Sequence, residues 1–164
     1  MIAFLIALFT VIADQVSKLI VLDKLVPIKD VPLWDGVFHL HYTENTGAAF
    51  GMLSGNQWLF FIFVGVAIVG IIYFIIRYRK QIPTMALISF GLILGGAIGN
   101  YIDRLRLGYV VDFLYFKLIN FAIFNVADMA VTIGAILLCI FAIFFYEKHM
   151  EKMKTASVEG NETK

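Results

Sequence analysis

Four long apolar stretches dominate the pattern of hydrophobic and polar positions along this chain. They occupy residues 2–22, 58–76, 82–102 and 124–146, and each comes close to the roughly 20 residues that a helix needs to cross a bilayer. Polar positions collect mainly in the connections and at the end of the chain. The pattern predicts an all-α membrane protein with four transmembrane helices.

A second pattern lies in the connection between the first two stretches, residues 23–57. Residues 37–42 alternate in part between apolar and polar side chains, which is typical of a β-strand. The sequence Asn45-Thr46-Gly47 follows as a turn signal. We therefore expect a small antiparallel β-sheet that lies on the membrane surface and caps the helix bundle.

The composition supports the membrane class for the whole chain. Of its 164 residues, 61% are hydrophobic and 15% are charged, and the mean hydropathy is +0.88. Because about a quarter of a soluble domain is charged, a cytosolic enzyme and a disordered chain are excluded. The net charge of +1 leaves no basic face for nucleic acid. The pattern predicts one integral membrane domain over residues 1–150 and a disordered polar tail over residues 151–164.

The one cysteine in the sequence, Cys139, excludes a disulfide framework and a cysteine-based zinc site. Since it lies deep in the fourth apolar stretch with no base nearby in the sequence, we interpret it as a packing residue.

Basic residues predict the orientation of the spans. Arg77, Arg79 and Lys80 crowd the tight link between the second and third stretches, so this link is expected in the cytoplasm. Four spans then place both termini on the cytoplasmic side, together with the tail. Residues 23–57 and their sheet are expected on the extracytoplasmic side.

Four aspartates lie in or beside the apolar stretches: Asp14, Asp103, Asp112 and Asp128. An ionised side chain inside a bilayer costs at least a few kcal/mol, so each is a candidate functional residue. The predicted topology brings all four to the outer side of the membrane, although they are far apart in sequence. A plainer explanation exists for Asp14, because Lys18 lies four residues later on the same helical face and can neutralise it.

Asn125 and Asp128 likewise suit an ordinary helix N-terminal cap. As a group, however, the carboxylates suit two kinds of enzyme site. One is an aspartyl dyad, in which two close carboxylates share a proton and activate water. The other is a divalent-metal site. Outside enzymes, a small four-helix proton-coupled transporter would use Asp14 as its coupled charge, and a non-catalytic membrane adaptor would tolerate asparagine at Asp112 and Asp128.

Five short motifs follow one another along the chain. They are Asp14-Gln15-Val16-Ser17-Lys18, Asn45-Thr46-Gly47-Ala48-Ala49-Phe50-Gly51, Gly99-Asn100-Tyr101-Ile102-Asp103-Arg104, Gly108-Tyr109-Val110-Val111-Asp112-Phe113 and Phe124-Asn125-Val126-Ala127-Asp128. In this order they resemble the motifs of the bacterial lipoprotein signal peptidases, also called signal peptidase II. The resemblance implies an intramembrane aspartyl endopeptidase.

The family's activity is then the expected one. It removes the signal peptide of diacylglyceryl-modified prolipoproteins and cuts just before the lipidated cysteine. The resemblance implies a multi-pass protein of the bacterial cytoplasmic (inner) membrane with its active site near the outer face. Its partners would be prolipoprotein signal peptides and membrane lipid, with no nucleic acid. No cofactor is expected, and the protein is expected to act as a monomer.

The resemblance places the catalytic pair at Asp112 and Asp128, with Asp103 as the rival for the first position. The other expected site residues support the pair or contact the substrate; they are Asp14, Lys18, Asn45, Gly47, Asn100, Asp103, Arg104, Asn125 and Ala127. Two features depart from the family pattern. The link from Asp112 to Asp128 is short, and Ala122 stands where many members have proline.

The resemblance, together with the positions of these residues in the sequence, suggests individual roles. Asn125 would orient the catalytic pair, and Asn100 and Arg104 would shape the site from the third helix. Asn45 and Gly47 would contact the substrate backbone, while Asp14 and Lys18 would brace the first helix. Glycines at positions 47, 51 and 55 suggest that this outer segment closes over the substrate.

Overall fold

The computed structural model describes residues 1–47 and 57–147, with only the backbone described for residues 57–60. Four helices form the bundle: α1 (Ile2–Ile20), α2 (Gln57–Tyr78), α3 (Thr84–Leu107) and α4 (Val126–Phe144). A short π-helical segment, η1 (Val21–Leu25), continues α1. By length and composition, each helix includes a stretch that can cross a membrane. The predicted fold class is confirmed.

The sheet has three antiparallel strands in the order β1-β2-β3: β1 (Asp30–Trp34), β2 (Phe38–Asn45) and β3 (Val110–Phe116). The third strand comes from the connection between α3 and α4, where the sequence pattern predicted no strand. A 3-10 turn, η3 (Lys117–Ile119), follows it. The fold therefore joins two connections that lie far apart in sequence.

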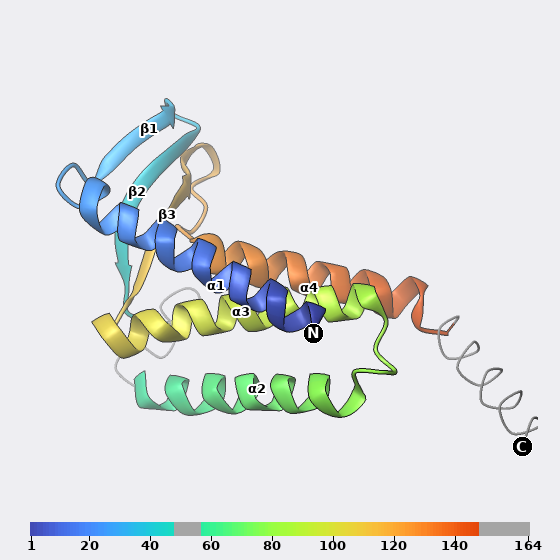
Figure 1. Cartoon of the computed structure of the whole chain (residues 1–164). Helices are drawn as coiled ribbons and strands as arrows, with labels where there is room; N and C mark the ends of the chain where they lie inside the picture. Colours follow the sequence, from blue (N-terminus) through green and yellow to red (C-terminus); the bar gives the residue numbers. More distant parts are fainter. Residues whose placement is uncertain (48–56, 148–164) are drawn as a thin grey trace, which may run out of the picture.

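The sheet lies at one end of the bundle, and the α2–α3 link and Met1 lie at the other (Figure 1). Val21 and Leu25 of η1 pack with Val111 and Phe113 of β3 in one buried cluster. This cluster anchors the sheet on the end of α1, because full burial of a large apolar side chain contributes about 1.5–3 kcal/mol per side chain.

Small residues allow α3 to lie close to its neighbours. Gly91, Gly95 and Gly99 recur every four residues on α3, and a Cβ atom at any of them would collide with α1. At Gly99 that atom would lie 2.5 Å from Oδ2 of Asp14. Such stripes of small residues let membrane helices approach closely in lipid, where helix association depends on packing. α2 lies on the far side of α3 from α1, with Ile75 in the buried contact (Figure 1).

Two sequence interpretations change with the structure. Cys139 is exposed on the surface of α4, so its interpretation as a packing residue was wrong. The third helix continues to Leu107, five residues beyond the expected end at residue 102, and Asp103 and Arg104 therefore lie within it. The tail over residues 151–164, Gly51 and Gly55 lie outside the described residues.

Candidate functional site

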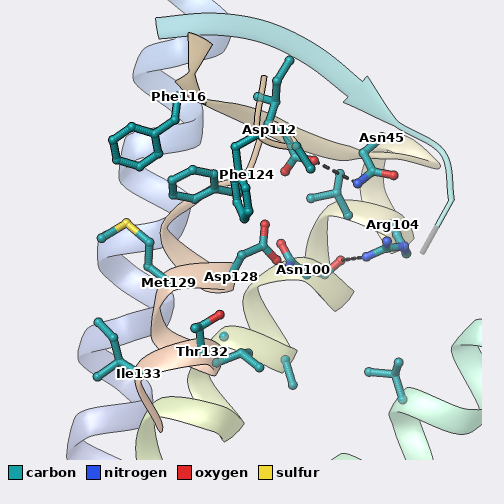
Figure 2. Close-up of a pocket in the computed structure, with 18 residues that line it drawn as sticks. Asn45, Asn100, Arg104, Asp112, Phe116, Phe124, Asp128, Met129, Thr132 and Ile133 are labelled. Atoms are coloured by element: carbon teal, nitrogen blue, oxygen red, sulfur yellow. Dashed lines mark hydrogen bonds between the residues drawn. The ribbon is translucent and has the colours of Figure 1, made fainter. Parts of the chain in front are cut away.

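A cavity of about 790 Å³ opens between α3, α4 and β3, below the sheet. Apolar side chains dominate its wall, and its polar side chains gather near one end (Figure 2). The lining residues are Asn45, Val64, Gly96, Ala97, Asn100, Arg104, Val110, Asp112, Phe116, Phe121, Ala122, Ile123, Phe124, Asp128, Met129, Val131, Thr132 and Ile133. Among these described lining residues, Asp112 and Asp128 are the two carboxylates.

Asp112 reaches the cavity from β3 and is only 2% exposed. Its Oδ2 accepts a hydrogen bond from Nδ2 of Asn45 at 2.9 Å, and its Oδ1 accepts one from Nδ2 of Asn125 at 2.6 Å. Burial raises the pKa of Asp112 to about 6, and the negative charge of Asp128 adds to this rise. The two amide donors act in the opposite direction without cancelling it.

Asp128 is held by the start of α4. Asn125 is the N-cap of this helix: its Oδ1 accepts from the backbone N–H of Asp128 at 3.0 Å. In return, Oδ2 of Asp128 accepts from the backbone N–H of Asn125 at 3.1 Å. This reciprocal capping box confirms the cap expected from the sequence. It also fixes the direction in which the Asp128 carboxylate points.

Two amide side chains connect the carboxylates. Nδ2 of Asn100 donates to Oδ1 of Asp128 at 2.8 Å. Oδ1 of Asn100 accepts from Nδ2 of Asn125 at 3.1 Å, and the same Nδ2 donates to Asp112. Lys18 donates from Nζ to the same Oδ1 of Asn100 at 2.8 Å. Because two donors hold this oxygen, the Asn100 amide must direct its N–H groups towards Asp128.

The other two aspartates lie behind this layer, away from the cavity wall. Nζ of Lys18 is 2.9 Å from Oδ2 of Asp14 and 2.9 Å from Oδ2 of Asp103. The expected pairing of Asp14 with Lys18 is therefore confirmed. Asp14 also accepts from the backbone N–H of Ala127 at 3.0 Å, and Asp103 accepts from that of Val111 at 3.1 Å. One buried lysine thus joins carboxylates that hold the backbone on either side of the cavity.

Arg104 and Gly47 meet at the sheet side of the cavity. Nη2 of Arg104 donates to the carbonyl oxygen of Gly47 at 2.8 Å. The backbone N–H of Gly47 donates to Oδ1 of Asn45 at 3.1 Å, so Asn45 closes a turn and also holds Asp112. Residues 48–51 of this motif lie outside the described residues.

Sequence reasoning gave no role to Gln15, although it stands in the first motif. Its Nε2 donates to Oδ1 of Asp103 at 2.9 Å and to the carbonyl oxygen of Gly99 at 3.2 Å. Its position directly after Asp14 was the available signal, because polar residues inside a span need partners. The aromatic wall of the cavity, which includes Phe116 and Phe124, was also missed, since no periodic pattern relates these residues.

The chain is similar in sequence to one known protein family and to several of its members. A family model described as signal peptidase (SPase) II matches residues 6–144 of the chain. The lipoprotein signal peptidase of Clostridioides difficile (strain 630) is 42% identical over 148 residues, which cover 90% of this chain and 99% of that protein. The lipoprotein signal peptidase of Caldanaerobacter subterraneus subsp. tengcongensis is 49% identical, covering 87% of this chain and 96% of that protein.

Solved structures give the same picture. One structure described as a bacterial membrane enzyme superposes with a TM-score of 0.76 at 36% identity, covering 86% of each chain. Another with the same description has a TM-score of 0.75 at 34% identity, covering 87% of this chain and 93% of the other.

Proposed function

The chain belongs to the signal peptidase II family, and we propose from this premise that Asp112 and Asp128 are its catalytic pair. The protein is an aspartic endopeptidase that removes signal peptides from prolipoproteins. One observation carries the choice of the pair: both carboxylates line one cavity and share a chain of amide hydrogen bonds, whereas Asp14 and Asp103 are bound to Lys18 behind it.

The pair performs its chemistry with one shared proton. Asp112 holds this proton, because its burial raises its pKa to about 6. Asp128 is less buried than Asp112, and its carboxylate accepts hydrogen bonds from Nδ2 of Asn100 and from the backbone N–H of Asn125. In this proposal Asp128 takes a proton from the attacking water, and Asp112 donates its proton to the oxygen of the scissile carbonyl. Asp128 then passes the proton it took to the leaving amine nitrogen as the C–N bond breaks, and Asp112 regains its proton from the hydroxyl group of the intermediate as the carboxyl product forms.

The polar neighbours keep this arrangement ready before the substrate arrives. Asn125 donates hydrogen bonds to both Asp112 and Asp128, and Asn100 donates one to Asp128. Arg104 lines the same cavity and carries donors that suit a peptide carbonyl. Fixed donors and acceptors of this kind need little reorganisation when charge develops in the transition state.

The apolar part of the cavity suits the lipidated substrate. Its wall of aromatic and aliphatic side chains can take a hydrophobic signal segment that enters from the bilayer, while the acyl chains of a diacylglyceryl-modified cysteine stay in lipid. We propose cleavage just before that cysteine, at the outer face of the bacterial inner membrane, with both termini in the cytoplasm. The basic residues Arg77, Arg79 and Lys80, at the opposite end from the sheet, support this orientation.

The decisive experiment compares the purified protein with three Asp→Asn variants on a diacylated prolipoprotein. Asp112→Asn and Asp128→Asn should each reduce cleavage by about three orders of magnitude or more, as removal of an essential catalytic group does. Asp23→Asn is the matched control, because Asp23 is exposed and pairs only with the neighbouring Lys24 among the described contacts. It should cleave like the wild type.

A melting curve in detergent first establishes that each variant is folded. A folded Asp112→Asn or Asp128→Asn variant with appreciable activity would reject the pair. Asp103→Asn is measured beside them: if it is folded and inactive while Asp112→Asn is active, the catalytic role belongs to Asp103.

A further inference from the structure

Exposed apolar side chains lie at one end of the sheet, at the end of β1 and in the segment that follows β3. We call this surface the apolar rim; its members are Leu33, Trp34, Leu118, Ile119 and Phe121. The exposed fractions are 60% at Leu33 and 69% at each of Trp34, Leu118 and Ile119. Exposed apolar groups of this size mark a surface that contacts protein or membrane.

The two halves of the apolar rim are held together by the sheet. Trp34 pairs with Phe38, and Phe38 pairs with Phe116, so an aromatic residue stands at this end of all three strands. The rings of Phe38 and Phe116 lie 4.8 Å apart. The backbone N–H of Leu118 donates to the carbonyl oxygen of Val37 at 3.3 Å. The end of β1 and the segment after β3 are therefore held next to each other at this end of the sheet.

Along the direction of the helix axes, the apolar rim lies at the same level as part of the helix bundle. In Figure 1 the β1–β2 turn and the segment after β3 lie to one side of the bundle; along the helix axes they are level with the first turns of α4 and set back from the sheet-side ends of α1 and α3. Phe121 lines the cavity together with Met129 and Ile133, which are 43% and 47% exposed on the membrane-spanning α4. The rim thus continues the lipid-facing surface of α4.

We propose that the apolar rim is inserted into the bilayer leaflet on the sheet side, where it contacts the acyl chains of membrane phospholipids. Tryptophan is enriched at this depth because its ring is apolar and its N–H can reach polar headgroups. Lys117, which is exposed and adjoins Leu118, can extend its ammonium group to a headgroup phosphate. Insertion holds the sheet against the bilayer beside the cavity, independently of which residues are catalytic.

The test uses tryptophan fluorescence in vesicles of phosphatidylcholine with brominated acyl chains, since bromine quenches tryptophan at short range. The Trp58→Phe variant leaves Trp34 as the only tryptophan. A second variant, with both tryptophans replaced by Phe and Ile119→Trp added, reports from the other half of the rim. The control places Glu44→Trp in the same background, because Glu44 is exposed near the opposite end of β2.

Both rim tryptophans should emit at short wavelength and be quenched severalfold more strongly by brominated lipid than the control. Replacing Leu118 and Ile119 together by Asp should reduce the quenching of Trp34. Red-shifted emission and quenching by aqueous iodide at the rim would show that it faces water and overturn the proposal. Weak bromine quenching together with shielding that grows with protein concentration would overturn it too, because a second copy would then cover the rim.

Discussion

Asp103 and Asp112 lie nine residues apart around the end of one helix, yet their surroundings suit them to different tasks. Asp103 forms an ion pair with the ammonium group of Lys18 and accepts a hydrogen bond from the backbone N–H of Val111. Within the described residues, Asp112 accepts its hydrogen bonds from the neutral amides of Asn45 and Asn125, and it faces the cavity. A group that must hold a proton and release it cannot be paired directly with a lysine, and this difference favours Asp112.

The raised pKa of Asp112 predicts the pH dependence of cleavage. The reaction needs a proton on Asp112, so kcat/KM should fall on the alkaline side as pH rises through about 6. The measurement is kcat/KM of the wild type on a diacylated prolipoprotein between pH 4 and pH 9, with protein stability checked at each pH. If kcat/KM instead rises with pH through this range, the reaction does not require a proton on Asp112.

Stability provides an independent test of the same pKa. A carboxyl group whose pKa is raised in the folded state contributes stability at low pH, and that contribution is lost as pH rises from about 3.8 through about 6. Asp112→Asn removes this pH dependence. The difference in Tm between Asp112→Asn and the wild type should therefore shift in favour of the variant as pH rises from 4 to 7. A constant difference would show that the pKa of Asp112 is not raised.

At the scale of elements, the first turn of α4 depends on its contact with α1. Ala127 donates its backbone N–H to Asp14 of α1 at 3.0 Å, and Asp128 is the next residue. Asp14 can reach it only because Gly99 of α3 has no side chain in the way. Three helices thus meet at one point, and the position of Asp128 depends on all of them.

Gly99→Ala tests this contact. The added Cβ would lie 2.5 Å from Oδ2 of Asp14, so the Asp14 carboxylate must move from its present position, at a cost of about 1–3 kcal/mol for an overpacked core. We expect a lower Tm and a lower kcat, because Asp128 shifts with the start of α4. Gly70→Ala is the matched control, since a Cβ atom at Gly70 has no neighbour within 4 Å. Equal stability and kcat in the two variants would show that the close contact is not required.

At the scale of the whole molecule, polar groups concentrate in one layer near the sheet end of an otherwise apolar bundle. In the part of the chain that the structure describes, every buried side-chain nitrogen or oxygen has a hydrogen-bond partner. This matters in a membrane, because an unpaired polar group there costs several kcal/mol. The charged layer is therefore compatible with a stable fold because its described buried polar groups are all hydrogen-bonded.

Labelling of single cysteines tests the proposed orientation of this layer. In a Cys139→Ser background, Lys29→Cys should react with an impermeant thiol reagent on intact cells, whereas Lys80→Cys should react only after permeabilisation. Both positions are exposed, so neither result can be attributed to burial. Labelling on intact cells at position 80 but not at position 29 would show that the protein has the opposite orientation, with the cavity on the cytoplasmic side.

The sequence by itself determined the four spans and the sheet segment before α2, and it supplied the candidate site residues apart from Gln15 and the aromatic wall. Hydropathy along a segment decides whether it enters a bilayer, and a charge in such a segment is costly enough to stand out. The motifs determined the family. These features are local in the chain, so one sequence is sufficient to detect them.

Only the tertiary structure decided how these residues are combined. Thr43 pairs with Asp112 across strands from different connections, and this pairing makes β3 a strand and turns Asp112 to the cavity. The contact between Asp14 and Gly99 and the orientation of the Asn100 amide likewise join distant segments. Such pairings depend on how closely helices pack and which donors remain unpaired, and no single segment contains that information.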